Sequence, residues 1–278
     1  MPTETTISAD ARIRFGQYVR DLWNYRDLFR ALVERDLKVR YKQTVLGIIW
    51  VILVPLSLAG VFSVIFTRVV TIDTQRLPPL LFFLAGSIPW MCFANGLSQS
   101  ANSMESNAGL LSKIYFPRLI IPGAMILGTV VDFVIGWVFF NIMAAIWGHW
   151  TWLFIPFTAI LLVIQLATAM GIGLIFAILN AQYRDIRYAV PFLIQLGMWI
   201  SPVVWPAKRL LATRLGSDLV FFLYLNPMAG VIESYRALLI GDYLPYRLLA
   251  SNFIAAFLLL VGGIVFFKKR EQKIIDLL

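Results

Sequence analysis

The chain has 278 residues, of which 60% are hydrophobic, and it carries a formal net charge of +9. Soluble domains have a smaller apolar fraction, so the composition predicts an integral membrane protein whose extra apolar surface faces lipid or other helices. The cations lie at the ends of apolar runs, where the positive-inside bias explains them, so nucleic-acid binding is not indicated. Cys92 is the one cysteine, which excludes an intramolecular disulfide and a multi-cysteine metal site.

Residues 1–45 are predicted to form a cytoplasmic tail followed by an amphipathic helix. Residues 1–11 are polar and lack the apolar region of a signal peptide. From Asn24, where an N-cap is expected, to Lys42, apolar residues recur at helical spacing and cations fill the other face. Such a helix can lie flat among lipid headgroups, or it can rest on a soluble partner as an ordinary solvated helix. Its cations nearest the membrane are Arg35, Lys38, Arg40 and Lys42.

Residues 46–278 are predicted to form one transmembrane domain with six membrane-spanning helices. The first run, 46–67, holds 22 uncharged residues, which is enough to cross about 30 Å of hydrocarbon. The segments on the side of the membrane that holds both termini carry more cations than the short loops on the other side. Both termini are therefore expected in the cytoplasm. The fold class is therefore an all-α integral membrane protein. The spans are expected at 46–67, 80–104, 119–147, 153–180, 188–205 and 248–267.

Two of these spans contain residues that lipid does not favour. The second span carries Pro89, which should kink or break the helix, and its second half is rich in amides and hydroxyls. Asp132 is the one acid deep inside an apolar run, in the third span. Acids in such positions are functional candidates, although a hydrogen bond to a polar neighbour within the bundle would explain Asp132 equally well.

The connection 105–118, between the second and third spans, has an amphipathic pattern. Its apolar and basic residues run from Leu110 to Phe116, and Pro117 ends the stretch. From the residues alone this loop is either a short helix that docks on a partner or a solvated turn.

The connection 206–247, between the fifth and sixth spans, is long and contains two apolar patches. They cover residues 219–225 and 228–239, and the dipeptide Asn226-Pro227 separates them. Each patch is too short to cross a bilayer, so two short re-entrant helices are predicted on the outer face.

The sequence carries no motif for nucleotide binding or catalysis. The Walker A pattern G-x-x-x-x-G-K-[S/T] is absent, so this chain should not bind ATP in the P-loop manner. The loop acids are scattered over both membrane faces, which does not favour a polytopic enzyme such as a lipid-linked sugar transferase. We therefore predict a non-enzymatic chain with no cofactor or metal of its own, driven by another polypeptide.

Several stretches resemble one family of membrane proteins, in the same order over nearly the whole chain. In these stretches the chain resembles the permease subunits of ABC-2 type polysaccharide exporters, which move O-antigen, capsular polysaccharide or teichoic acid across the cytoplasmic (inner) membrane. No single motif names the cargo, so an ABC-2 exporter of a small hydrophobic drug or lipid remains an alternative. The stretches are RDLKVRYKQTVLGIIWVILVPL (35–56), LLSKIYFPRL (110–119), YRDI (183–186), SPV (201–203), LNPM (225–228) and the lysine-rich tail.

The resemblance implies a homodimer of this chain with two copies of a separate ATPase subunit, which would bind ATP and Mg²⁺. Residues 24–42 would be the interface helix on the cytoplasmic side. Residues 105–118 would hold a coupling helix that docks into a groove of the ATPase. The coupling residues would be Leu110, Lys113, Ile114, Tyr115, Phe116 and Arg118.

By the same resemblance, a lipid-linked polysaccharide would pass between two permease chains along aromatic side chains that stack on sugars. The re-entrant helices would form an outer gate around Asn226 and Pro227. Packing in the core or against lipid is the alternative explanation for each aromatic residue, because the chain has 21 Phe, 10 Tyr and 9 Trp. The candidate path residues are Trp90, Phe93, Asn95, Gln99, Asn102, Trp199 and Tyr224.

Overall fold

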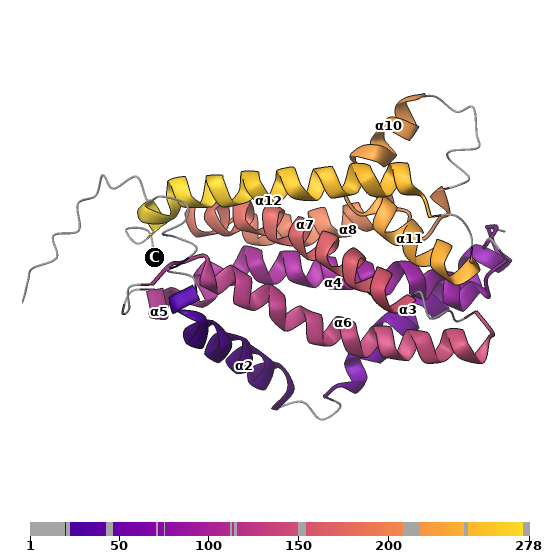
Figure 1. The fold of residues 1–278 in the computed structure, drawn as a ribbon, viewed down its shortest axis with the longest axis horizontal. Helices are drawn as coiled ribbons and strands as arrows, with labels where there is room; N and C mark the ends of the chain where they lie inside the picture. The colour runs from indigo at the N-terminus through magenta and orange to yellow at the C-terminus, as the bar shows by residue number, and fades with distance from the viewer. Residues whose placement is uncertain are drawn as a thin grey trace, which may run out of the picture.

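The computed structural model describes residues 20, 23–42, 47–70, 72–74, 76–111, 113, 116–149, 154–207, 217–241 and 244–274. Within these ranges every regular element is a helix, which confirms the all-α prediction for this part of the chain (Figure 1). The helices are α2 (Arg26–Lys42), α3 (Ile49–Arg68), α4 (Pro79–Ser106), α5 (Ala108–Leu111), α6 (Ile120–Ile146), α7 (Phe154–Gln182), α8 (Ile186–Ile200), α10 (Ser217–Leu225), α11 (Ala229–Ile240) and α12 (Tyr246–Ile274).

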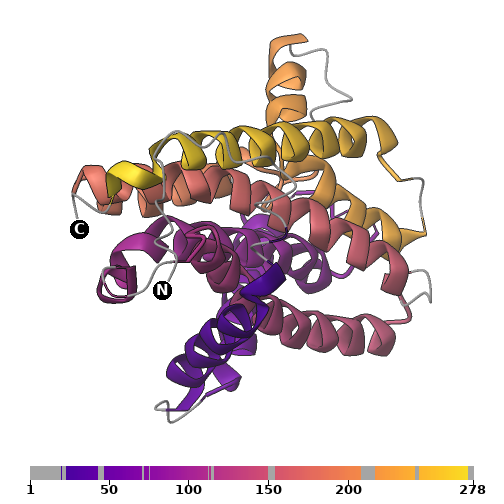
Figure 2. The ribbon, with the colours of Figure 1, turned by 60° about the vertical axis from the view of Figure 1, so that its left-hand side comes forward.

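Helix α4 lies at the centre of the bundle. Most of its residues are buried, and it packs against α3, α6, α7, α8 and α11. The helix is continuous from Pro79 to Ser106, so Pro89 does not break it. Helices α4, α6, α7 and α12 run side by side, with α2 and α5 near one end and α10 and α11 toward the other (Figures 1 and 2). The predicted coupling segment and the predicted gate therefore lie at opposite ends of the bundle.

Five helices are long and apolar enough to cross a membrane, namely α3, α4, α6, α7 and α12. They coincide with five of the six predicted spans, and they place the chain among multi-pass membrane proteins. Helices α3 and α12 leave many apolar side chains exposed, among them Val64, Phe253 and Leu258. Such surfaces suit contact with lipid rather than water.

Helix α8 ends before the end of the fifth predicted span, 188–205. Helix α8 has 15 residues and ends at Ile200, so it covers about 22 Å at about 1.5 Å per residue. That is shorter than a hydrocarbon core of about 30 Å. Pro202 explains the early end, because a residue before proline avoids the helical conformation, and Ser201 is extended with a ψ of 150°.

Helices α7 and α12 approach each other closely at a glycine pair. The backbone of Gly171 abuts that of Leu259 and Gly263, so a side chain at either glycine would force the helices apart. On the other side of α7, a Cβ at Gly173 would lie 2.5 Å from the Ser100 side chain of α4. These two glycines thus let α7 pack closely against helices on both of its sides.

The two apolar patches of the long connection form α10 and α11, on either side of Asn226 and Pro227. Helix α11 is almost wholly buried and packs against α4, α7 and α12. Gly241 ends it in the left-handed conformation, with a φ of 69°, as glycine commonly does at a helix C-terminus. Helix α10 projects from the bundle and exposes Phe221 and Phe222 (Figure 2).

Candidate functional site

Helix α2 packs along the first half of α6. Its apolar stripe, with Leu32 at its centre, joins a core cluster that also contains residues of α4, α6, α7 and α12. Phe29 lies against Gly123 of α6, where an added Cβ would be 3.4 Å from the ring. The helix begins at Arg26, two residues after the predicted start. An amphipathic sequence therefore forms a helix that is fixed to the bundle by its apolar side.

The four predicted interface cations of α2 differ in their surroundings. Arg35 donates a hydrogen bond of 2.5 Å to Oδ1 of Asn107, at the end of α4. Lys38 forms an exposed ion pair with Glu34 on its own helix, and Lys42 is exposed. Arg40 is turned into the bundle. Of the four, Lys38 and Lys42 are the most available to lipid headgroups or a partner.

The predicted coupling segment forms a shorter helix than expected, and some of its side chains contact other parts of the same chain. Helix α5 has four residues, and only Leu110 of the predicted coupling residues belongs to it. Phe116 is 3% exposed and packs in the same cluster as Leu32, so it supports the loop from inside. Arg118 donates to the backbone carbonyl of Glu271 on α12. Lys113 is exposed, whereas Ile114 and Tyr115 lie outside the described residues.

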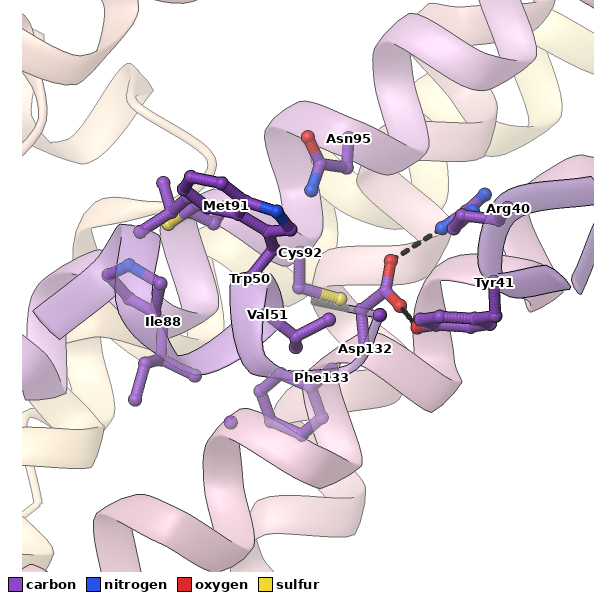
Figure 3. Close-up of a pocket in the computed structure, with 14 residues that line it drawn as sticks. Arg40, Tyr41, Trp50, Val51, Ile88, Met91, Cys92, Asn95, Asp132 and Phe133 are labelled. Carbon is purple, nitrogen blue, oxygen red and sulfur yellow. Dashed lines mark hydrogen bonds and ion pairs between the residues drawn. The ribbon is translucent and has the colours of Figure 1, made fainter. Parts of the chain in front are cut away.

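Asp132 accepts hydrogen bonds from two side chains at the end of α2. Arg40 donates from Nη1 to Oδ2 at 2.5 Å, and the hydroxyl of Tyr41 donates to Oδ1 (Figure 3). Arg40 also donates to Asp36 on its own helix at 2.8 Å. Burial, and then the hydrogen bond to Asp132, raise the pKa of Tyr41 above its usual value, so the hydroxyl keeps the proton that it donates. Of the two explanations for Asp132, the structure favours the hydrogen-bonded one.

These side chains lie at the edge of a cavity of about 260 Å³ between the end of α2, the first turns of α3, and helices α4 and α6. Trp50 and Val54 of α3 form one wall, and Cys92 and Asn95 of α4 form another (Figure 3). Asn95, a predicted path residue, is therefore separate from the aromatic path residues. Gln99 and Asn102 are partly buried farther along α4, and Asn102 accepts from Asn180 of α7 at 3.1 Å.

A second and larger cavity, of about 600 Å³, lies between α4, α7, α8 and α10 and extends to Met228, which precedes α11. It is lined by Trp90 and Phe93, whose ring centroids are 5.3 Å apart, and by Asn226 and Pro227. The structure thus joins two predicted path residues to the predicted gate. Trp199 is about half exposed on α8 and contacts Phe62 of α3 outside this cavity.

Asn226 connects the helices around this cavity. Its Nδ2 donates to the hydroxyl of Ser201 at 2.9 Å, and its Oδ1 accepts from the backbone N–H of Met228 at 3.0 Å. Its carbonyl accepts from Nδ2 of Asn252 on α12 at 2.8 Å. Tyr224, the other predicted path residue here, is partly buried beside Leu223 on α10. The dipeptide therefore ties the end of α8 to α11 and α12.

Sequence reasoning missed the buried ion pair of α11. Arg236 is fully buried and pairs with Glu233 at 2.8 Å. It also donates to the carbonyls of Pro202 and Val203, both at 2.6 Å, while Glu233 accepts from the N–H of Ala207 at 3.0 Å. The signal was an Arg and a Glu three residues apart in an otherwise apolar stretch, where a buried charge needs a partner.

The helices and their contacts define a class of protein, namely a multi-pass membrane protein with pockets between its helices. A family model described as "ABC-2 type transporter" matches residues 27–240. The O-antigen export system permease protein RfbA of Myxococcus xanthus is 30% identical over 258 residues, which are 91% of this chain and 96% of that protein. The protein of the same name from Klebsiella pneumoniae is 29% identical, over 91% and 95% of the two chains. The polysialic acid transport protein KpsM of Escherichia coli is 26% identical, over 87% and 93%.

The chain belongs to the ABC-2 type transporter family. It is a permease subunit, the membrane component of such a transporter and not the ATPase. Membership implies partnership with an ABC ATPase subunit. Among the residues that the structure describes, no group of three or more His, Cys, Asp or Glu is placed to hold a metal ion.

Proposed function

We propose that this chain is the permease of an ATP-driven exporter that moves a lipid-linked polysaccharide across the cytoplasmic membrane. The observation that carries the proposal is similarity along almost the whole chain to permeases named for O-antigen export, with 30% identity over 91% of the residues. Similarity to a polysialic acid transport protein supports the same cargo class. The cavity beside Trp90 and Phe93 agrees with it, because aromatic faces can stack on sugar rings.

The working unit is a homodimer of this chain with two copies of an ATPase subunit, which bind ATP and Mg²⁺. Helix α8 supports the dimer, because its apolar side chains Phe192, Leu196 and Trp199 are exposed although the helix ends within the bilayer depth. A break in a helix at that depth needs protein or a wet cavity beside it. The ATPase docks at the α5 end of the bundle, where Lys113 is exposed.

In this proposal the chain crosses the membrane six times, with both termini in the cytoplasm. The five long helices provide five passages, and α8 with residues 201–207 provides the sixth. Helix α2, in the segment 1–45, lies at the cytoplasmic surface, while α10 and α11 enter the membrane from the outer side. Residues 46–278 form one transmembrane domain. The placement of α5 and α11 at opposite ends of the bundle supports this orientation (Figure 1).

The proposal is tested by deleting the gene in the native host and measuring lipid-linked glycan in the cytoplasm and polysaccharide on the surface. We expect glycan to accumulate inside and to disappear outside, with both effects reversed by the wild-type chain. Purification of the chain in mild detergent should retain an ATPase with a Walker A motif at a one-to-one ratio. Normal surface polysaccharide, together with altered efflux of lipids or hydrophobic drugs, would favour the alternative ABC-2 cargo.

A further inference from the structure

Asp132 lies near the middle of α6, and both of its carboxylate oxygens are occupied by α2. Oδ2 receives the guanidinium of Arg40 and Oδ1 receives the hydroxyl of Tyr41. Asp36 shares the same guanidinium. The side chains of Arg40, Asp36 and Asp132 keep only 21%, 16% and 17% of their exposure, so most water has been removed from all three charges. We refer to these four residues as the Asp132 cluster.

The cluster is unlike the other ion pair of α2. Lys38 and Glu34 keep about 70% of their exposure, and a pair of that kind contributes little to stability. A carboxylate with little water around it is costly unless a cation and hydrogen-bond donors satisfy it. An acid inside a hydrophobic helix is a candidate for a functional role, and here its contacts indicate that the role is to hold another helix.

Helix α2 is fastened to the bundle at two separate levels. Near its middle, Arg35 holds Asn107, which directly precedes α5, and Leu32 packs with Phe116. At its last turn, Arg40 and Tyr41 hold Asp132. The chain then continues to α3, whose first turns form a wall of the 260 Å³ cavity. One helix therefore runs from the α5 end of the bundle to the pocket that the first turns of α3 also line.

We propose that Asp132 is a positioning residue for export: it fixes the last turn of α2, and thereby the start of α3, so that movement of α5 is transmitted to the membrane helices. The proposal rests on the proposed function for the source of that movement. Asp132 does not carry protons or cargo in this scheme, because both oxygens are already occupied by groups of the protein. In this scheme α2 and α6 must carry opposite charges at this contact, but either helix can carry the acid.

A charge exchange tests this directly. Arg40→Glu and Asp132→Lys each break the pair, whereas the double variant restores opposite charges and keeps the net charge of the cluster. Cys92 is the reporter, since it is the one cysteine of the chain, is buried, and lines the same cavity. We expect its labelling by a small maleimide to become about tenfold faster in each single variant. The double variant should label more slowly than either single variant but faster than the wild type, because Arg40→Glu places a second acid beside Asp36 and Asp132→Lys removes the acceptor of Tyr41. Asp73→Asn, which removes an acid from an exposed outer loop, is the control and should label like the wild type.

Coupling is then measured as polysaccharide exported per ATP hydrolysed, with the ATPase subunit bound. The single variants should lower this ratio and the double variant should recover part of it. If a reversed charge prevents folding, Asp132→Asn is the variant to measure, because it removes the charge without reversing it. We expect this variant to show intermediate labelling and coupling, with the same relative loss at pH 6 and pH 8.

Two outcomes would overturn the proposal. One is a double variant as impaired as either single variant. The other is an Asp132→Asn protein that abolishes export while Cys92 stays protected, since that result would assign Asp132 to transport chemistry. The labelling experiment needs no cargo, so a wrong cargo assignment would fail in the export assay and leave the labelling result intact.

Discussion

The guanidinium of Arg236 lies 3.7 Å from the centroid of the Phe82 ring, so a fully buried cation of α11 rests on an aromatic side chain of α4. The stacking leaves the edge of the guanidinium free to donate to carbonyls of the chain that follows α8. Desolvation makes a buried charge costly, and the carboxylate of Glu233 and these carbonyls offset the cost. Arg236 thus holds three parts of the proposed outer end together.

Replacing Arg236 by Met should destabilise this end strongly. The change leaves the carboxylate of Glu233 buried without its cation and removes the donors to Pro202 and Val203, at a cost of about 3–5 kcal/mol. The measurement is the thermal unfolding temperature of the purified chain in detergent, and it should fall clearly. Arg68→Met, at an exposed position at the end of α3, is the matched control. Equal unfolding temperatures for the two variants would contradict a structural role for the buried pair.

Gly86→Ala should disturb the same region without changing any charge. An added Cβ would lie 2.8 Å from the carbonyl oxygen of Val203 and 2.9 Å from Nη2 of Arg236. Such overpacking costs about 1–3 kcal/mol. In Gly262→Ala on α12 the new Cβ meets nothing within 4 Å, so this variant should be neutral or more stable by up to about 1 kcal/mol. The comparison of the two unfolding temperatures checks the close approach of α4 to residue 203.

Phe116 and Lys113 should separate folding from docking. Phe116→Ala removes a buried ring and should lower stability by about 3–5 kcal/mol, because the cluster around Leu32 cannot fully collapse. Lys113→Glu changes an exposed charge and should leave the unfolding temperature unchanged while weakening ATPase binding by about tenfold, less so at high salt. Binding of the purified ATPase to each variant is the readout. Unchanged affinity in Lys113→Glu would remove this residue from the docking surface.

Asn226 and Ser201 should act as one unit. Asn226→Ala removes the bond to Ser201 and leaves the N–H of Met228 unpaired at the start of α11, at a cost of about 1–2 kcal/mol. We expect the resting dimer in liposomes to leak a trapped small dye faster than the wild type. Ser201→Ala should give a smaller leak, and the double variant should leak no more than Asn226→Ala alone. Additive leaks would show that the hydrogen bond between them does not close the gate.

The long apolar runs predicted most of the helices well. The runs that became α3, α4, α6, α7 and α12 are apolar over a length at which only a helix can satisfy their backbone in lipid. Residues 219–225 and 228–239 likewise became α10 and α11, since Asn226-Pro227 and Gly241 separate helices by local chemistry. These features depend on neighbours in sequence, which is why they could be predicted.

The site was less predictable because it depends on partners distant in sequence. Asp132 could be given two roles until the structure brought Arg40, 92 residues away, to its carboxylate. Phe116 was expected at a docking surface but is buried. An apolar residue in a polar loop has the same sequence pattern whether its side chain faces a partner or the core of its own chain. Arg236 and Glu233 could be noticed as a charged pair in an apolar stretch, but the other partners of Arg236 are backbone carbonyls, which have no sequence signature.

The early end of α8 also concerns the thickness of the lipid bilayer. In the proposed topology, about 22 Å of helix and the non-helical residues 201–207 together cross a layer of about 30 Å. At that depth the carbonyls of Pro202 and Val203 accept hydrogen bonds from the side chain of Arg236. A mismatch in thickness should therefore act on residues 201–207 and their bonds to Arg236 and Glu233, whereas the long helices can tilt. Lipids with longer acyl chains should thus alter the proposed outer gate before they alter the rest of the bundle.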